Sequence, residues 1–502
     1  MGEILLCIKW KLVLMLEKES LTRRDFLKKV VLAVMGMAAG YSLFRFFRKI
    51  TPEPENSGPW KWSGENKSSY VGKTDPKEVY DVVIVGCGMA GAVAGLTALK
   101  RNLNVCIMEK NEREFIGRKI CGEMTPQRIV DWLRNEFNLS IDCYPLRGLE
   151  IYSSSGHTSR ITGPTCMIDR WQVGQTMLEN LLDKGAEVCH ETVKSSVVES
   201  SVRGVETKDS IIYSTVTIDC SGVSSVLRRK LFSEPQFLGL AYKENLILEE
   251  PIEMEYAMLL LDKNILPSGY VWCFPKSEYE LNVGAGGLEQ GGTSLEETLE
   301  KAIEALGIKS KIKRREFPGF GLVPLGRPLP SMVYPGFLVC GDAASHVNPL
   351  TGGGIAPAVT AGYLAASTSA EAVENNDVST RGMWKYNYDF AREYGKKHAV
   401  LIVARDFLVS LSDEELDYFL KNVITDDELQ QLMEGKTPYK GDGILQTFLE
   451  HWRSPRLLYR MYRAFTLMRH VKDHYERYPR RPEEFPAWRE TLDKYIKVYQ
   501  RG

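Results

Sequence analysis

The chain has 502 residues, of which 44% are hydrophobic, and its formal net charge at pH 7 is -1. This length and composition predict two or three well-cored globular domains, and the balanced charge gives no reason to expect a nucleic-acid partner. The ten cysteines include no C-x-x-C pair and the seven histidines form no ligand cluster, which excludes a disulfide framework or a zinc site; no metal is expected.

The N-terminal region, residues 1–50, contains a segment that closely resembles a twin-arginine export signal. Its two arginines lie within Ser20–Lys29, and the apolar run Val30–Phe44 follows them. That run has the length of a signal's hydrophobic region and is short for a spanning helix. We expect export of the folded protein to the cell envelope. The alternatives are a buried or basic amphipathic helix, with the protein at the cytoplasmic face of the membrane.

No clean cleavage site follows the apolar run, so we expect residues 1–50 to be a signal or an uncleaved membrane anchor. Residues 1–14 place another apolar stretch ahead of the arginines, and we therefore expect translation to start at Met15 rather than Met1. Residues 51–78 are rich in proline, glycine and serine, which predicts an exposed linker.

A glycine fingerprint for a nucleotide comes next. The apolar run Asp81–Val85 predicts a buried strand, and Ala92–Leu99 predicts the helix after the glycines. The following strand ends at Glu109, about 20 residues on, where a carboxylate can accept hydrogen bonds from both hydroxyls of a ribose. The alternative is a glycine-rich turn in an unrelated α/β fold. The fingerprint glycines, which favour a tight turn, close approach of a pyrophosphate and helix packing, are Gly86, Gly88 and Gly91.

Two later segments fit the other walls of a flavin site. One is Thr217–Gly222; the other runs from the end of a predicted strand at Gly341 through Asp342. We expect Asp342 to bind a ribitol hydroxyl of FAD, with a helix N-cap as the alternative role. The run Ile355–Ala366 predicts a helix whose N-terminus faces the flavin and stabilises its reduced, anionic form. The glycines before that helix are Gly352, Gly353 and Gly354.

Taken together, these motifs resemble the geranylgeranyl reductase family of FAD-dependent oxidoreductases over about residues 79–375. That family is built on the glutathione-reductase-type Rossmann fold and is related to flavin monooxygenases and halogenases. The resemblance implies that Gly341 and Asp342 form the second FAD motif. It also implies cofactor contacts from Arg170 and from a D-x-x-G motif that contains Asp219 and Gly222.

A second point of resemblance is the segment Gly269–Pro275, which is similar to the family's Y-x-W-x-F-P substrate-cavity motif. Period-2 alternation in a strand places Tyr270, Trp272 and Phe274 on one face, where they could line an apolar tunnel above a flavin. Ordinary sheet packing is the alternative. Halogenases carry a related W-x-W-x-I-P motif, so a halogenase also stays open.

The third point is Lys119–Glu123, which is similar to the family's K-x-C-G segment near the flavin ring. Cys121 is the candidate catalytic residue, as a proton donor or a redox-sensitive thiol. The alternative is a small buried core cysteine.

The predicted fold class is α/β, with a Rossmann-type FAD domain interleaved with an antiparallel-sheet substrate domain and followed by a helical C-terminal region. Within the region 376–502, the stretch Trp452–Arg481 interleaves basic and aromatic residues. It predicts either a helix that rests on an anionic membrane surface or one that packs on the body with a solvated basic face. The predicted FAD domain comprises 79–145, 165–235 and 330–375, and the predicted substrate domain comprises 146–164 and 236–329.

The resemblance implies reduction of C=C bonds of a polyprenyl, geranylgeranyl-type lipid by hydride transfer from reduced flavin. The alternatives are a flavin-dependent monooxygenase, halogenase or dehydrogenase on an apolar substrate, and a lipid carrier that has kept the fold. No second nucleotide fingerprint is evident, so the electron donor is unknown. An exported site also has little access to cytosolic NADPH.

Overall fold

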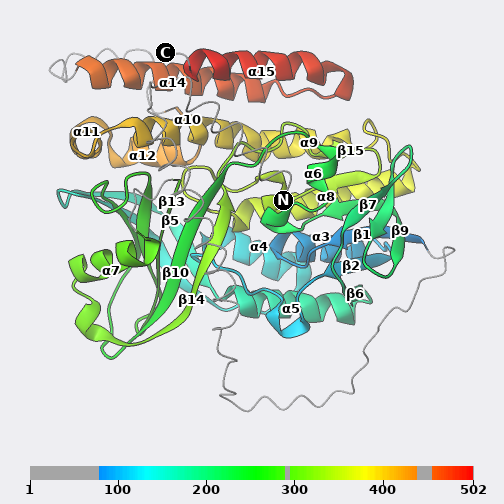
Figure 1. Cartoon of the computed structure of the whole chain (residues 1–502), viewed down its shortest axis with the longest axis horizontal. Coiled ribbons are helices and arrows are strands. Elements are labelled where there is room, and N and C mark those ends of the chain that lie inside the picture. The colour runs from blue at the N-terminus through cyan, green and yellow to red at the C-terminus, as the bar shows by residue number, and fades with distance from the viewer. Residues whose placement is uncertain (1–78, 289–293, 438–454, 501–502) are drawn as a thin grey trace, which may run out of the picture. The chain divides into compact units, whose positions relative to one another are not determined.

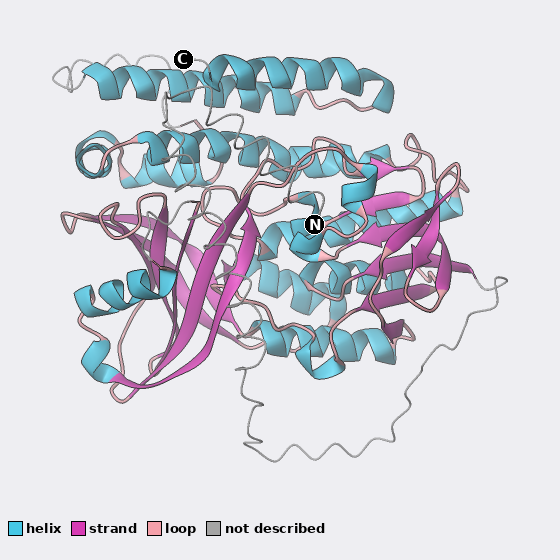
Figure 2. Cartoon of the chain, viewed as in Figure 1, coloured by secondary structure: helices cyan, strands magenta, loops and turns pink. Residues whose placement is uncertain are grey.

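The computed structural model describes residues 79–288, 294–437 and 455–500, which all fall within one structural unit, 69–502 (Figure 1). The predicted export signal, the predicted start at Met15 and the predicted linker lie outside the described residues. Two β-sheets lie next to each other in this unit, and the C-terminal helices stack above them in two layers (Figure 2).

The first sheet is built around central strands of apolar residues that are buried on both faces. Its strands are β1 (Val79–Val85), β2 (Val105–Glu109), β6 (Glu187–His190), β7 (Ser195–Val198), β8 (Val202–Glu206), β9 (Ile211–Asp219), β15 (Val333–Tyr334) and β16 (Phe337–Val339). Their order is β15-β16-β9-β1-β2-β6, with β8 joined to β9 and β7 to β8. The central strands β16, β9, β1, β2 and β6 are parallel. The predicted strand–glycine–helix–strand unit is therefore present as β1, a helix and β2.

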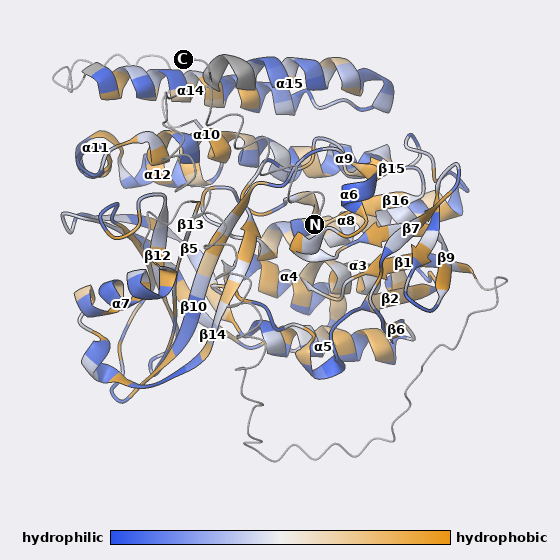
Figure 3. Cartoon of the chain, viewed as in Figure 1, coloured by the Kyte–Doolittle hydropathy of each residue, from blue (hydrophilic) through white to orange (hydrophobic). Residues whose placement is uncertain are grey.

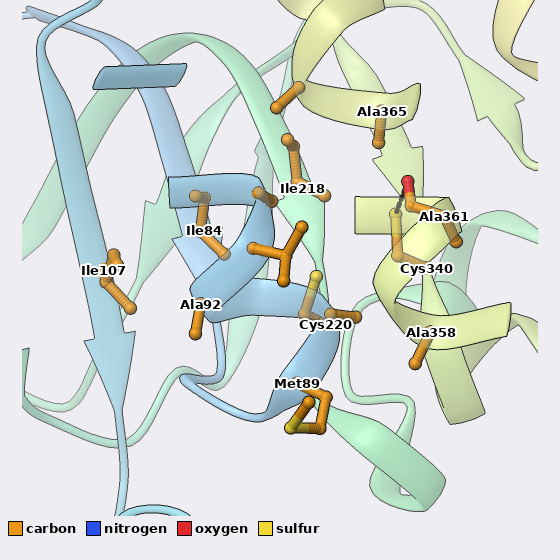
Figure 4. Packing of buried hydrophobic residues seen from close by; sticks show 14 of the residues in the cluster. Ile84, Met89, Ala92, Ile107, Ile218, Cys220, Cys340, Ala358, Ala361 and Ala365 are labelled. Carbon is orange, nitrogen blue, oxygen red and sulfur yellow. Dashed lines mark hydrogen bonds between the residues drawn. The ribbon is translucent and has the colours of Figure 1, made fainter. Parts of the chain in front are cut away.

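Helices cover this sheet. They are α3 (Met89–Lys100), α5 (Arg170–Asp183), α6 (Arg228–Leu231) and α8 (Ile355–Glu374). α3 packs against both α5 and α8. A Cβ atom on Gly362 of α8 would lie 2.2 Å from the carbonyl oxygen of Ala90, so these two helices approach each other at backbone distance. Figure 4 shows the small residues that allow this packing, among them Ala92, Ala358 and Ala361, beside Cys220 and Cys340.

The second sheet is mainly antiparallel, in the order β14-β10-β13-β12-β11-β4-β5-β3. Its strands are β3 (Met124–Pro126), β4 (Cys143–Ser153), β5 (Thr158–Ile168), β10 (Leu238–Leu248), β11 (Tyr256–Leu261), β12 (Gly269–Ser277), β13 (Glu280–Gly287) and β14 (Ile312–Pro324). β12 alternates as expected. Trp272 and Phe274 pack toward the C-terminal helices, whereas Val271 and Cys273 pack in a separate core that includes residues of α7 (Leu295–Ala305).

The second sheet also includes residues that the sequence assigned to the cofactor domain. β3 and the end of β5, residues 165–168, both belong to it. The reason is that β5 is one continuous strand, which pairs with β4 along its length and with β3 at its end. The chain therefore passes between the two sheets at different positions from those predicted.

The C-terminal region is helical. It contains α9 (Trp384–Phe390), α10 (Lys396–Ser410), α11 (Asp413–Tyr418), α12 (Asp426–Met433), α14 (Pro455–Glu476) and α15 (Phe485–Gln500). Earlier in the chain, α4 (Gln127–Phe137) contacts β3 and β5 of the second sheet. α14 packs on α10 through side chains that are fully buried, such as Met461, Ala464 and Met468. The basic stretch thus packs on the body, while Tyr459 and Tyr462 stay exposed.

Figure 3 shows apolar residues along the inner strands and α3, and a mixture of polar and apolar residues along α14 and α15. None of the helices in the described ranges is both long enough and apolar enough to cross a membrane.

Candidate functional site

One cavity of about 1180 Å³ brings most of the predicted site residues together. Its walls come from the glycine motifs of the first sheet, the segment around Cys121, the aromatic face of β12 and the helices α10 to α12. The predicted residues that line it are Gly86, Gly88, Glu109, Cys121, Arg170, Gly222, Tyr270, Trp272, Phe274, Gly341, Asp342, Gly352, Gly353 and Gly354. The structure places Gly91 and Asp219 behind this wall.

The three fingerprint glycines have different surroundings. Gly86 has φ +100°, and a Cβ atom there would lie 2.5 Å from the carbonyl oxygen of Cys220. A Cβ atom on Gly91 would lie 1.8 Å from the carbonyl oxygen of Gly86, so this glycine allows α3 to pack against the turn. Gly88 has nothing within 4 Å of its Cβ position and faces the open cavity.

Two helices begin at this cavity without a side-chain cap. α3 follows its N-cap Gly88, and α8 follows its N-cap Gly354, and neither N-cap makes a side-chain hydrogen bond. The first-turn N–H groups of both helices are therefore left for water or a ligand, and both positive dipole ends favour an anion or an acceptor-rich group. By contrast, α5 is capped by Asp169, whose carboxylate accepts a hydrogen bond from the N–H of Gln172 at 3.0 Å.

Glu109 is held in place by the backbone. Its Oε2 accepts a hydrogen bond from the N–H of Cys87, and its Oε1 accepts one from the N–H of Asn111, both at 2.8 Å. Each carboxylate oxygen can accept a further bond, and Glu109 lines the cavity. This arrangement fits a carboxylate oriented to accept bonds from ribose hydroxyls.

Asp219 has a different position from the one expected of a cofactor ligand. It is fully buried, and its carboxylate accepts hydrogen bonds from the N–H groups of Ser221 at 3.0 Å, Arg228 at 2.9 Å and Leu227 at 3.3 Å. Burial raises the pKa of this carboxyl. Asp219 therefore organises the turn behind the wall, and the turn presents Gly222, at φ +68°, to the cavity.

Asp342 and Lys119 form an ion pair at the cavity. Asp342 lies inside the first turn of a short 3₁₀ helix, Gly341–Ala344, whose N-cap is Cys340, so the N-cap role considered for it is not the one it has. The K-x-C-G segment and the second FAD motif, which are 223 positions apart in the chain, thus meet through their charged side chains.

His346 supports the same motif, and sequence reasoning missed it. This buried histidine accepts a hydrogen bond at Nδ1 from the N–H of Gly341, at 3.1 Å. Burial lowers the pKa of His346, so the ring is neutral and its Nδ1 is available as an acceptor.

Arg170 supplies an independent test of whether a cofactor fits here. It is the first residue of α5, is buried and lines the cavity, and its Nε has no hydrogen-bond partner among the described residues. A buried donor without a partner is costly unless a ligand accepts its hydrogen bond. Together with the open position at Gly88 and the uncapped α3 and α8, this donor set fits FAD.

A network of buried polar side chains holds the segment around Cys121. Trp272 Nε1 donates a hydrogen bond to Asn282 Oδ1 at 2.9 Å. Asn282 Nδ2 donates to the carbonyl oxygen of Cys121 at 2.9 Å and to Glu123 Oε2 at 3.0 Å. Lys276 Nζ lies 3.0 Å from the same Glu123 oxygen. The fully buried Asn282 thus ties the cysteine segment to the aromatic strand.

The local backbone explains why Cys121 faces the cavity. Glu123 has φ +63°, and its N–H donates a hydrogen bond to the sulfur of Cys121 at 3.3 Å. The thiol is half-buried in the cavity wall rather than packed in the core. The sequence carried one signal for this network, which is a polar asparagine within the otherwise apolar run Leu281–Ala285.

The aromatic residues lie in a row along the cavity. The ring centroids are 6.2 Å apart for Tyr270 and Trp272 and 6.4 Å apart for Trp272 and Phe274. A Cβ atom on Gly122 would lie 3.1 Å from the ring of Phe274, so this glycine makes room for the ring. The hydroxyl of Tyr270 donates a hydrogen bond to the carbonyl oxygen of Thr351, next to the glycine run before α8.

Beyond the aromatic row the cavity is apolar and passes beneath α10. Lys397 and Val409, which both line it, lie about 18 Å apart along the helix axis at about 1.5 Å per residue. The apolar lining residues of this section are Leu149, Ile151, Ile161, Leu259, Leu261, Leu408, Leu416, Phe419, Leu420, Leu429, Leu432 and Met433. The C-terminal helices therefore roof the site, a role that their sequence did not indicate.

Comparisons with known proteins agree with this geometry. The sequence model of a family described as lycopene cyclase protein matches residues 81–425. Digeranylgeranylglycerophospholipid reductase of Sulfolobus acidocaldarius is 29% identical over 451 residues, which cover 84% of this chain and 98% of that protein. Digeranylgeranylglycerophospholipid reductase 1 of Methanococcoides burtonii is 29% identical over 362 residues, which cover 68% of this chain and 86% of that protein.

Two solved structures show the same architecture. A geranylgeranyl bacteriochlorophyll reductase-like protein from Thermoplasma acidophilum aligns with a TM-score of 0.64 at 25% identity, over 77% of this chain and 99% of that one. A flavin-dependent brominase aligns with a TM-score of 0.55 at 19% identity, over 75% of this chain and 100% of that one. The second likeness shows a shared fold alone.

Proposed function

This chain belongs to the lycopene cyclase protein family, and from that premise we propose that it saturates carbon–carbon double bonds of a geranylgeranyl-type lipid. It is an FAD-dependent oxidoreductase of the geranylgeranyl reductase type. The proposed substrate is supported by relatives that are named digeranylgeranylglycerophospholipid reductases. The observation that carries the proposal is that the glycine-lined section and the apolar section beneath α10 form one cavity, with Cys121 between their walls.

The residues that would hold FAD are those around the glycine-lined section. Glu109 would accept hydrogen bonds from the ribose hydroxyls, and Asp342 would accept one from a hydroxyl of the ribitol chain. Gly88 and the uncapped start of α3 would receive the pyrophosphate, and the buried Nε of Arg170 would donate to an acceptor of the cofactor. When bound and reduced, FAD supplies the electron pair and one of the two hydrogens that saturate a double bond.

The chain's own residues orient the lipid, exclude water and deliver the proton. The aliphatic side chains beneath α10 and the rings of Trp272 and Phe274 offer an apolar lining that favours a prenyl chain over water. We assign the proton to the thiol of Cys121, which lines the cavity. The N–H of Glu123 would stabilise the thiolate that remains, and a proton from solvent restores the thiol.

The test is an anaerobic reaction of the purified, flavin-reduced protein with a geranylgeranylated glycerolipid. We expect the visible spectrum of oxidised flavin to return without oxygen, and the lipid to gain two hydrogens for each bond reduced. Flavin that stays reduced until air is admitted would instead favour oxygen chemistry, as in a monooxygenase or halogenase. Because the brominase shares only the fold with this chain, the likeness gives no independent support to that alternative.

We further propose that the protein works at a membrane in the cell envelope. The twin-arginine-like segment, Ser20–Lys29, supports export, and the basic α14 with its exposed Tyr459 and Tyr462 supports contact with a lipid surface. Export would separate the site from cytosolic NADPH, so we propose an electron donor other than that nucleotide. Fractionation of cells that express the full chain tests this, because protein recovered only from the soluble cytosol contradicts it.

A further inference from the structure

The apolar section of the cavity ends in two cations. Arg128, in the first turn of α4, and Lys397, in the first turn of α10, both line this end of the cavity. Both side chains line one cavity, and burial and the charge of Arg128 lower the pKa of Lys397. Arg128 is exposed and Lys397 is half-buried, and an anion that binds beside both would offset their mutual repulsion.

No ion pair with a carboxylate is found for either cation among the described residues. Glu434 lines the same end of the cavity and raises the pKa of Lys397, as does Glu393, but the Glu434 carboxylate lies 2.6 Å from Lys436. Gln430, which also lines the cavity, has a neutral side chain.

The backbone around Lys397 fixes its position. The turn after α12 packs against the aliphatic stem of Lys397, where a Cβ atom on Gly435 would lie 2.7 Å from its Cα. Gly435 itself has φ +76°, a conformation that glycine adopts at no steric cost. The backbone at Gly435 thus packs against Lys397 and restricts its side chain near the cavity.

We propose that Arg128 and Lys397 form an anion subsite that binds the phosphate group of a prenyl lipid whose chain lies beneath α10. This deepens the proposed function and rests on it. A guanidinium and an ammonium together suit a phosphate, since the first binds two oxygens in a plane and the second acts as a point charge. The apolar section then receives the chain, and the subsite sets which double bonds reach Cys121.

The experiment measures binding rather than turnover, so its failure is distinguishable from failure of the proposed reduction. The full-length, flavin-loaded protein is titrated with geranylgeranyl phosphate, geranylgeraniol and inorganic phosphate under air, with flavin fluorescence and calorimetry as readouts. We expect Arg128→Gln with Lys397→Gln to weaken binding of geranylgeranyl phosphate by roughly 10-fold to 100-fold, since bonds to charged groups are the strong ones. Binding of geranylgeraniol should change by less than about 2-fold.

Lys396→Gln is the matched control, because it removes the same charge from the neighbouring residue, which does not line the cavity. Competition by inorganic phosphate alone would assign the subsite to free phosphate as well as to a lipid headgroup. Equal affinity of the unaltered protein for the phosphate and the alcohol would overturn the proposal. So would equal loss of both ligands in the double variant.

Discussion

The indole Nε1 of Trp272 donates a hydrogen bond to Oδ1 of Asn282, at 2.9 Å, from one strand of the second sheet to the next. The amide of the same Asn282 donates to the carbonyl oxygen of Cys121. One side chain therefore sets the distance between an aromatic wall of the cavity and the segment that carries the candidate proton donor.

Replacing Asn282 with alanine should destabilise the protein. The change leaves Trp272 Nε1 and the carbonyl of Cys121 without their partner in a buried site, at about 1–3 kcal/mol for each unsatisfied group. We expect a loss of roughly 2–4 kcal/mol in the free energy of unfolding, measured by urea denaturation. The control is Asn422→Ala on the surface, expected to stay within about 0.5 kcal/mol. Equal effects of the two changes would refute a structural role for the network.

Cys121→Ala should lower the rate of lipid reduction without releasing the cofactor. Loss of a positioned proton donor costs about 100-fold in kcat or more. The measurement pairs single-turnover reoxidation of the flavin with its dissociation constant. Cys143→Ala is a matched control, because Cys143 is also half-buried but does not line the cavity. A variant that reacts at the normal rate would leave proton delivery to water.

Two alanine substitutions in the glycine fingerprint should separate folding from cofactor binding. Gly91→Ala places a methyl group 1.8 Å from a backbone oxygen, so we expect a loss of about 3 kcal/mol in stability. Gly88→Ala meets no atom within 4 Å, so the unfolding midpoint of the cofactor-free protein should hold while FAD affinity falls roughly 10-fold. The reverse pattern, with Gly88→Ala unfolding the protein, would contradict this assignment.

Asp342→Asn should weaken FAD binding by roughly 10-fold, because it removes a charged acceptor at the cavity and the partner of Lys119. Flavin fluorescence during titration of the cofactor-free protein measures this. Glu136→Gln, which breaks an exposed ion pair with Lys100, is the comparison and should leave the affinity unchanged. Equal affinities of the two variants would remove Asp342 from the cofactor site.

Stability should fall with acid because of His398. Burial lowers the pKa of this histidine from its ordinary value of 6.5 to about 3 in the folded protein. Between these two values the unfolded chain binds a proton at His398 that the folded chain does not. The contribution of His398 to the free energy of unfolding is therefore fully present above pH 6.5 and is lost as pH falls toward 3. The slope due to His398 is about 1.4 kcal/mol per pH unit.

The check is the free energy of unfolding of His398→Phe, measured between pH 4 and pH 7. The phenyl ring keeps the aromatic contact with Tyr394, and the slope with pH should fall by about 1.4 kcal/mol per unit. The exposed His190→Gln should keep the original slope. An unchanged slope in His398→Phe would mean that His398 does not contribute to acid unfolding.

The local elements were predicted best where the residue pattern that specifies an element lies within one continuous segment. The strand, glycine turn and helix from Asp81 to Leu99 need only backbone freedom and an apolar run, and both are readable locally. The alternation of β12 is likewise a property of one strand. The role of Asp219 was harder to predict, since a strand-end aspartate can face a ligand or its own turn, and only the path of residues 220–228 decides which.

Features that depend on distant segments escaped prediction for a physical reason. Glu123, just before β3, meets Lys276 of β12 and Asn282 of β13, and nothing in their spacing indicates that they interact. The cover that α10 to α12 form over the cavity also escaped prediction. An apolar helix face has the same sequence pattern whether it packs against a core or lines an open cavity. Arg128 and Lys397 are ordinary surface types until the fold brings them together.

The hydrogen bond from Tyr270 to Thr351 joins the lipid side of the cavity to the cofactor side. A prenyl chain that displaces the ring of Tyr270 also displaces the loop that leads into the uncapped start of α8. By thermodynamic linkage, lipid and cofactor then influence each other's affinity by the same factor. An exchange of the lipid at one side of this hydrogen bond is therefore felt at the other side, where the glycine run before α8 begins.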